Sequence, residues 1–233
     1  VSTNASGARS YRFGPIRRHV ASLDLVLAGG ETLSLRRTGE PSSAWTGRLV
    51  TDQGTVIDVP PLPYVSPPWK SAAGYFSARP MEPVDLFIGA EGTLAAIARV
   101  GIALAPAPSI LAGLTFFAGP AAAFDFADFL RGEPALAAIE FFDRGSLRFI
   151  NRGRGQLAGE FPAFPEGAGA AVLWEYVEGE GGSFEADLGR WEAALARCGA
   201  SFATTWSGFD ERERARLRRF RHALPEMVNR AVA

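Results

Sequence analysis

Short apolar segments separated by turns make up the N-terminal part of the chain, which is the pattern of antiparallel strands. Residues 23–28 and 32–37 are two such segments, and the Gly29-Gly30 pair between them suits a tight hairpin turn. A second hairpin is predicted to pair residues 48–50 with residues 55–59. The pattern therefore predicts a small antiparallel sheet in this part of the chain.

The segments around these hairpins lack a regular pattern of apolar positions. Residues 1–18 are polar and contain glycine, and residues 60–83 hold seven prolines, so we predict loops in both. An apolar run that ends at Leu104 predicts one further strand. The alternating prolines of residues 105–108 are typical of a linker, and we therefore place a domain boundary at residue 109.

The second part, residues 110–233, alternates strand and helix patterns, with Asp143 and Ser183 standing where helix N-caps are expected. The predicted elements are a strand at residues 114–117, a helix at 120–131, a strand at 136–142, a helix at 144–151, a strand at 171–177, a helix at 184–197, a strand at 202–206 and a helix at 211–224. This order contains strand–helix–strand twice, which is the arrangement of ferredoxin-like domains. We expect an α+β protein.

Composition and charge exclude several classes of protein. The chain has 233 residues, 24 Lys+Arg against 25 Asp+Glu and a net charge of −1, so it lacks the positive excess that nucleic-acid binding needs. Its single cysteine, Cys198, excludes an internal disulfide and a cysteine-rich metal site. No apolar run reaches the roughly 20 residues that span a bilayer. With no transmembrane segment or signal peptide in view, we expect a cytoplasmic protein.

Two segments of small residues are the first candidates for binding chemistry. Residues 2–9 (STNASGAR) and 89–95 (GAEGTLA) would let backbone N–H groups approach a bulky ligand. By itself the first segment is more typical of a surface loop, and the second of a tight turn between a helix and a strand. Neither matches the dinucleotide fingerprint or the phosphate-loop motif, so a nicotinamide Rossmann domain and a phosphate-loop NTPase are unsupported.

Taken together and in order, these and other segments resemble the FAD-linked oxidases of the vanillyl-alcohol oxidase/PCMH superfamily, in its D-lactate dehydrogenase/glycolate oxidase-like branch. The matching runs are NASGARSYRFGP at residues 4–15, KSAAGY at 70–75, DLFIGAEGTL at 85–94, IEFFD at 139–143 and FRHALPE at 220–226. The run at 85–94 is similar to the branch's signature Asp-Leu-Phe-(Ile/Val)-Gly-Ser-Glu-Gly-Thr-Leu-Gly. The last two runs are similar to its cap domain.

The resemblance implies a fold and an activity. Residues 1–109 would be the second part of a PCMH-type FAD-binding domain, and residues 110–233 a ferredoxin-like cap that shapes the substrate pocket. The implied reaction is oxidation of a D-2-hydroxy acid such as D-lactate or glycolate, with hydride transfer to flavin N5 and electrons passed to an unidentified acceptor. The first FAD subdomain would precede Val1, and metal ligands used by some members would follow Ala233.

The resemblance also implies which residues line the FAD, largely through their backbone groups. They are Asn4, Ala5, Ser6, Gly7, Ala8, Gly14, Gly89, Glu91, Gly92 and Thr93. The sequence departs from the family pattern at three positions: Ala90 replaces a frequent Ser, Ala95 a usual Gly and Ala98 a common Thr. Ala90 removes one hydroxyl contact that the family pattern would supply.

The substrate side of the predicted site rests on the helix at residues 211–224. Arg221 lies beside an apolar stripe and is our candidate for binding a substrate carboxylate, although the arginines of this helix equally fit a solvated charged face. His222 is the candidate proton carrier, with a surface histidine as the alternative. Lys70 is a further candidate for contact with the substrate, or else a loop cation.

Two other classes of function stay open at this point. The chain could be a non-catalytic, flavin-free binding or structural module that keeps the fold. An isolated ferredoxin-like interaction domain would explain residues 110–233 but not the N-terminal motifs. The sequence does not decide between a monomer and a homo-oligomer.

Overall fold

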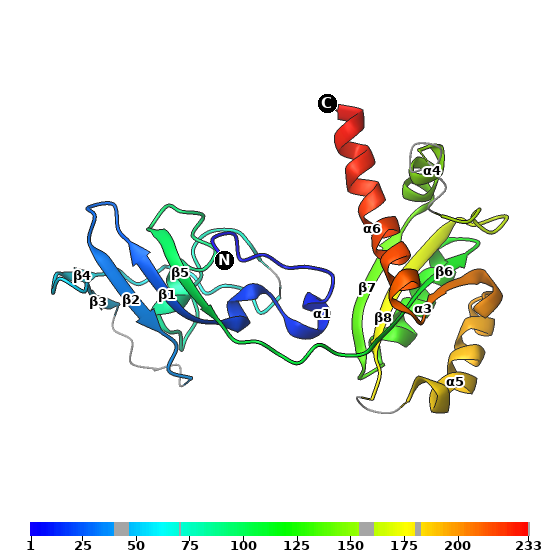
Figure 1. Ribbon diagram of the computed structural model, residues 1–233, viewed down its shortest axis with the longest axis horizontal. Coiled ribbons are helices and arrows are strands. Elements are labelled where there is room, and N and C mark those ends of the chain that lie inside the picture. The colour runs from blue at the N-terminus through cyan, green and yellow to red at the C-terminus, as the bar shows by residue number, and fades with distance from the viewer. Residues whose placement is uncertain (40–46, 70, 154–160, 180–182, 233) are drawn as a thin grey trace. The chain divides into compact units, whose positions relative to one another are not determined.

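The computed structural model describes residues 1–39, 47–69, 71–153, 161–179 and 183–232 and divides the chain into two compact units. The units are Val1–Pro106 and Ala107–Ala233. The proline-containing segment that joins them is drawn as an extended loop in Figure 1. The division falls within residues 105–108, a few residues before the boundary expected at residue 109.

Two antiparallel sheets form the first unit. Strands β1 (Val20–Val26) and β2 (Thr32–Arg36) form the predicted hairpin, and β5 (Ala96–Ile102) pairs with the other edge of β1, which gives the order β2-β1-β5. Strands β3 (Arg48–Val50) and β4 (Val56–Asp58) form the second predicted hairpin. The alternating apolar positions therefore predicted this part of the fold correctly.

Short helices occur where the sequence predicted only loop. The N-terminal segment contains α1 (Ser10–Phe13) and the 3-10 helix η1 (Ile16–His19), and the proline-rich loop ends in α2 (Pro83–Phe87). Proline at the first turn suits α2, and Glu82 caps it in a reciprocal pair with Asp85. These helices are too short to show a periodic apolar pattern, which is why periodicity missed them.

The core of the first unit lies between α2 and the inner face of the β1–β2 sheet. Leu23, Leu25 and Leu33 of the sheet pack with Phe87 of α2 and with Ile88, all at most 5% exposed. Each such side chain contributes roughly 1.5–3 kcal/mol through burial. Packing of α2 against the sheet fixes the position of the turn that follows it at residues 89–92.

The second unit has a four-stranded antiparallel sheet in the order β7-β8-β6-β9. Its elements are β6 (Ile110–Phe117), α3 (Pro120–Arg131), β7 (Leu136–Phe142), α4 (Arg144–Arg152), β8 (Ala170–Val177), α5 (Phe184–Arg197), η2 (Phe202–Thr204), β9 (Thr205–Gly208) and α6 (Glu211–Val232). Because β6 and β8 are the central strands and α3 and α5 are the crossovers, this is the split βαβ arrangement of a ferredoxin-like domain. The predicted α+β fold is confirmed.

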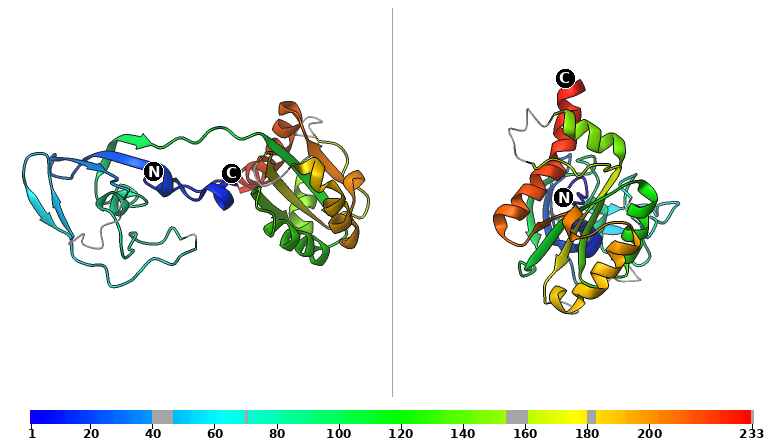
Figure 2. Two further views of the ribbon diagram at one scale, coloured as in Figure 1. Left: turned by 90° about the horizontal axis from the view of Figure 1, so that it is seen from below. Right: turned by 90° about the vertical axis from the view of Figure 1, so that its right-hand side faces the viewer.

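Helices cover both faces of this sheet. Trp174 of β8 packs with Phe126 of α3 and Trp191 of α5 on one face. Leu173, the neighbour of Trp174 in β8, points to the opposite face, where it packs with Phe220 of α6 and with α4. The right-hand view of Figure 2 shows α5 and α6 on opposite sides of the strands. Full coverage explains why β8 is apolar at nearly every position.

Several element ends agree with the sequence and others differ, such as β1, which begins at Val20 and not at residue 23, and β6, which begins at Ile110 and not at residue 114. Asp143 and Ser183 are N-caps as predicted, accepting hydrogen bonds from the backbone of Ser146 and Ala186 at 2.6 and 3.1 Å. The strand expected at residues 202–206 is wrong in part, because Ser201 and Thr204 form a capping box and the strand begins at Thr205.

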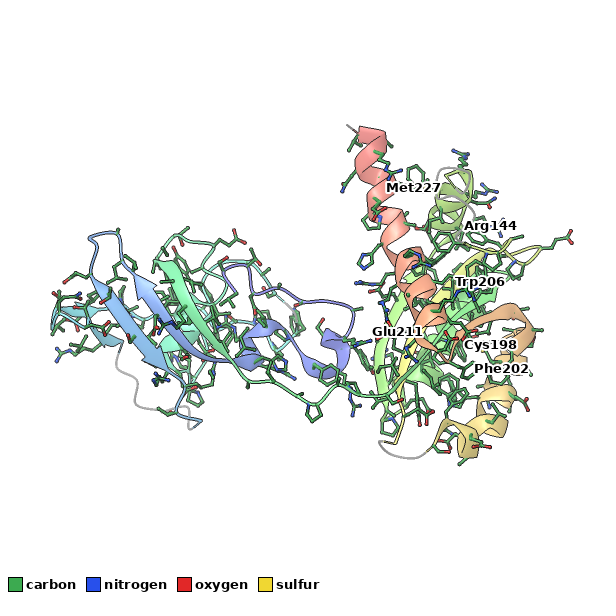
Figure 3. The ribbon with its side chains drawn as sticks, viewed as in Figure 1. Arg144, Cys198, Phe202, Trp206, Glu211 and Met227 are labelled. Atoms are coloured by element: carbon green, nitrogen blue, oxygen red, sulfur yellow. The ribbon has the colours of Figure 1, made fainter. Side chains whose placement is uncertain are left out.

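Helix α6 continues beyond its expected end at residue 224. It passes Pro225 and reaches Val232, although proline removes one backbone hydrogen bond. Met227 lies close to Gly153 at the end of α4, and Figure 3 shows Met227 on the part of α6 nearest to α4. This tertiary contact, which sequence periodicity does not reveal, accounts for the extra turns.

Candidate functional site

The two small-residue segments lie side by side in the first unit. The backbone N–H of Gly89 donates to the carbonyl oxygen of Val1 at 3.2 Å, and that of Glu91 donates to Ser2 at 2.8 Å. Asn4 and Glu91 have positive φ angles of 47° and 52°, which non-glycine residues seldom adopt. The structure therefore joins residues 1–4 and 89–91, which the sequence analysis had linked only through the family resemblance.

A cavity of 470 Å³ opens beside the N-terminal segment. Asn4, Ser6 and Gly14 line it on one side, and residues 66–69, 71 and 72 of the proline-rich loop, with Phe76, line it on the other. Trp69 is one of the lining residues, and 73% of its surface is exposed. The volume lies within the range of about 300–1,000 Å³ that is usual for small-molecule pockets.

A smaller cavity of 20 Å³ adjoins the first one, and Gly89 lines it together with Asn4 and Ile88. Four of the ten residues predicted to line FAD thus face these cavities: Asn4, Ser6, Gly14 and Gly89. The other six are not among the lining residues of either cavity: Ala5, Gly7, Ala8, Glu91, Gly92 and Thr93.

The turn after α2 is stabilised by further contacts. The Thr93 hydroxyl donates to the Ala90 carbonyl at 2.6 Å and pairs with the Tyr75 hydroxyl at 2.9 Å. Ala90 and Ala95, two of the departures from the family pattern, are buried, whereas Ala98 is exposed. Small, partly exposed residues and a neighbouring cavity fit the binding of part of a flavin nucleotide.

Beneath these cavities lies a network of buried charges that the sequence analysis missed. Arg37 donates to Glu82 at 2.7 Å and to Asp85 at 2.8 Å, and Arg17 donates to Asp85 at 3.3 Å. The Thr38 backbone N–H and hydroxyl both donate to Glu82, at 2.6 and 2.7 Å. The network ties β2, η1 and α2 together.

The environment changes the ionisation of these carboxylates. Burial by itself would raise the pKa of Asp85, but the hydrogen bonds and charge of Arg37 outweigh it, and the pKa of Asp85 lies below its ordinary value. Burial likewise opposes ionisation of Glu82, whereas hydrogen bonds from Thr38 and Arg37 lower its pKa. Both groups are therefore ionised at neutral pH and compensate the two arginines.

Arg221 forms an ion pair within the second unit. Its Nε donates to Glu140 Oε1 of β7 at 2.6 Å, and the two side chains are 29% and 27% exposed. Across the described ranges of the chain, the two terminal amino groups of Arg221 have no hydrogen-bond partner. The guanidinium is therefore held at its Nε and keeps two terminal amino groups for another group.

The other substrate-side candidates are less constrained. The side chain of His222, next to Arg221 on α6, is exposed, and Lys70 lies outside the described residues. Part of α6 is the charged face given as the alternative, since Arg214 and Arg218 pair with Glu211, which Figure 3 shows at the start of the helix.

Three further features bear on chemistry. Burial, together with the charge of Asp125, raises the pKa of the half-buried Cys198 thiol, which makes the thiolate scarce at neutral pH. Within the described ranges, no group of three His, Cys, Asp or Glu residues is placed to hold a metal ion. In that same part of the chain no helix has both the length and the apolar character to cross a membrane.

Comparison with known proteins finds similar sequences and similar structures. The sequence is 29% identical over 154 residues to "Probable D-lactate dehydrogenase, mitochondrial" of Danio rerio, covering 65% of this chain and 24% of that protein. A structure of alkyldihydroxyacetonephosphate synthase aligns over 86% of this chain and 31% of its own, with 13% identity and a TM-score of 0.50. A second crystal form of that synthase aligns over 88% of this chain and 31% of its own, with 14% identity and a TM-score of 0.48. No family model matches the chain.

These findings agree with the motifs. The sequence relative is a probable D-lactate dehydrogenase, and the first structural match shows a shared fold. The resemblance to the FAD-linked oxidases of the vanillyl-alcohol oxidase/PCMH superfamily is confirmed. The chain spans about a quarter of the length of the curated relative, 24%.

Proposed function

We propose that the chain is part of an FAD-dependent oxidoreductase that oxidises the CH–OH group of a D-2-hydroxy acid. The observation that carries this proposal is the pairing of residues 1–4 with residues 89–91 beside a cavity, in a chain with sequence similarity to a D-lactate dehydrogenase. Residues 1–109 would be the second part of a PCMH-type FAD-binding domain and residues 110–233 its cap.

In this proposal the first unit holds the cofactor. Asn4, Ser6 and Gly89 would hold FAD largely through backbone groups and short polar side chains, because larger residues would block the approach of the ring system or the pyrophosphate. FAD, when bound, supplies an acceptor for the hydride of the substrate α-carbon. The protein supplies position, exclusion of water and electrostatics.

The second unit would hold the substrate carboxylate. Arg221 supports this assignment because its terminal amino groups have no partner in the part of the chain that the structure describes, while Glu140 fixes its Nε. A planar guanidinium held in this way can bind a carboxylate through two parallel hydrogen bonds. His222 stays a candidate for accepting the hydroxyl proton, and Lys70 for contact with the substrate.

The first test is the visible absorption spectrum of the natively purified chain, with the flavin quantified after denaturation. We expect about one flavin per chain, bound without assistance or after addition of FAD. Addition of D-lactate, with L-lactate as the stereochemical control, should then bleach the flavin band selectively. A chain without bound flavin after incubation with FAD and removal of the excess would contradict the proposal, and would be an incomplete fragment or a flavin-free module.

A further inference from the structure

Arg17 contacts each segment that surrounds the two cavities. Its backbone N–H donates to the side-chain oxygen of Asn4 at 3.2 Å. Its guanidinium donates to the backbone carbonyls of Asp85 and Ile88, at the end of α2. The same guanidinium stacks on Phe76, whose ring centroid is 3.9 Å away. One residue thus joins three segments, because its backbone binds Asn4 while its side chain binds the end of α2 and stacks on the proline-rich loop.

The two terminal nitrogens of this guanidinium are paired inside the protein, whereas its Nε is buried without a hydrogen-bond partner in the described residues. The side chain is only 12% exposed, and the Asp85 carboxylate lies 3.3 Å from it. The last carbonyls of a helix have no partner within the helix, so the two backbone bonds from Arg17 supply what α2 lacks. Arg17 lines both cavities, and because its terminal nitrogens are committed to α2 and Asp85, these contacts assign it to the structure around the cavities.

The carbonyl of Ile88 is next to the residue that pairs with the N-terminal segment. Gly89 packs so closely that a Cβ there would lie 3.2 Å from Asn4 Cβ and 3.6 Å from the Arg17 guanidinium. Its backbone N–H also binds Val1. Moving the Ile88 carbonyl would therefore move Gly89 away from the N-terminal segment.

We propose that Arg17 is a positioning residue for the FAD site: it holds residues 88–91 against residues 1–4 before the cofactor binds. This inference rests on the proposed function, since it concerns the affinity of the same site. A lysine at this position keeps the charge but lacks the planar fork, so it cannot bind two carbonyls and stack on Phe76 at once.

The experiment compares Arg17→Lys with the wild-type chain and with Arg36→Lys, a matched control on an exposed arginine of β2. FAD affinity is measured by titration, and backbone amide exchange of residues 1–8 and 86–95 is measured by mass spectrometry without FAD. If the site is ordered in only a tenth of the variant molecules, the Kd for FAD rises about tenfold. We expect that rise with faster exchange in both segments for Arg17→Lys, and neither change for Arg36→Lys.

Each result has a defined meaning. Unchanged affinity in Arg17→Lys, with wild-type FAD binding intact, would overturn the inference and leave the proposed function standing. Weaker binding with unchanged exchange would also overturn it, because Arg17 would then act by touching FAD. Failure of the wild-type chain to bind FAD would overturn the proposed function and the inference together.

A second variant covers the case in which Arg17→Lys does not fold, as judged by circular dichroism. Phe76→Leu removes the stacking contact and leaves the hydrogen bonds of Arg17 in place. We expect a smaller change in the same direction, with weaker FAD binding and faster exchange of residues 86–95. FAD affinity and exchange equal to those of the wild type would contradict the positioning role.

Discussion

Arg221 is oriented by its ion pair with Glu140. The Nε of Arg221 is committed to Glu140, so the side chain is oriented before any substrate arrives. The helix pattern indicated that Arg221 borders an apolar stripe, but its partner lies on a strand that is 81 residues away in sequence. Sequence spacing along one helix carries no information about such a partner.

Arg221→Ala is expected to lower kcat/KM for the hydroxy acid by about 30-fold, which corresponds to about 2 kcal/mol for a lost carboxylate partner. Flavin content should stay unchanged, because Arg221 belongs to the second unit. Arg212→Ala, which changes an exposed arginine of the same helix, is the control and should leave kinetics unaltered. Equal kinetics for both variants would return Arg221 to the solvated charged face.

The lowered pKa values of Asp85 and Glu82 predict a loss of stability in acid. A carboxylate with a lowered pKa in the folded state stabilises the protein fully above its ordinary pKa, here 3.8 for Asp and 4.5 for Glu. That stability is lost as the pH falls through the folded-state values, so the melting temperature should decline below about pH 4.

Asp85→Asn separates this network from general acid effects. Removing one partner of a buried ion pair costs about 3–5 kcal/mol, so we expect a lower melting temperature at pH 7 and a weaker decline toward pH 3. Asp58→Asn, at an exposed carboxylate paired with Arg48, should change neither. Thermal melts followed by circular dichroism between pH 7 and pH 3 measure both effects.

At the level of elements, long periodic segments were predicted correctly and short ones were not. Helices α3 and α5 and strand β7 have the predicted bounds, because each presents an unbroken apolar pattern to a core. The short helices α1 and η1 span four residues each, α2 depends on its proline and capping box, and the C-terminal extension of α6 contacts α4. The local apolar pattern decides the bounds of α3, α5 and β7, whereas contacts made in the folded chain decide where α6 ends.

Close packing between neighbouring strands gives a prediction for β6. Gly113 lies opposite Trp174, and a Cβ at Gly113 would meet the indole ring. The ring is rigid and buried, so Gly113→Ala should destabilise the second unit by about 1–3 kcal/mol. The measurement is urea unfolding followed by circular dichroism.

Gly189→Ala is the matched control for that substitution. Gly189 lies within α5, and a Cβ there would have no neighbour within 4 Å in the described part of the chain. Alanine in a helix interior is favoured over glycine by roughly 0.5–1 kcal/mol, so this variant should be more stable than the wild type. A stable Gly113→Ala variant would show that Trp174 can rearrange.

For the whole molecule, the sequence identified the segments of the candidate site but not the buried ion pairs that hold those segments in place. Ordered motifs indicated that residues 4–8 and 89–93 belong to one site, and the structure joins residues 1–4 to residues 89–91. The supporting network of Arg17, Arg37, Glu82 and Asp85 went unnoticed, because Arg17 and Asp85 are 68 residues apart and the signature that begins at Asp85 does not indicate its partners. Such buried ion pairs join residues that are distant in sequence, so they become visible only in the folded chain.

The position of Trp69 at the larger cavity has an optical consequence. Its indole is largely exposed, whereas Trp174 and Trp191 lie buried in the second unit with ring centroids 4.8 Å apart. Flavins absorb where tryptophan emits, so FAD in the cavity should quench the red-shifted emission of Trp69 by energy transfer. Trp69→Phe should remove that part of the quenching without changing the flavin content. The chain would thus report occupancy of its cavity by its own fluorescence, without an attached dye.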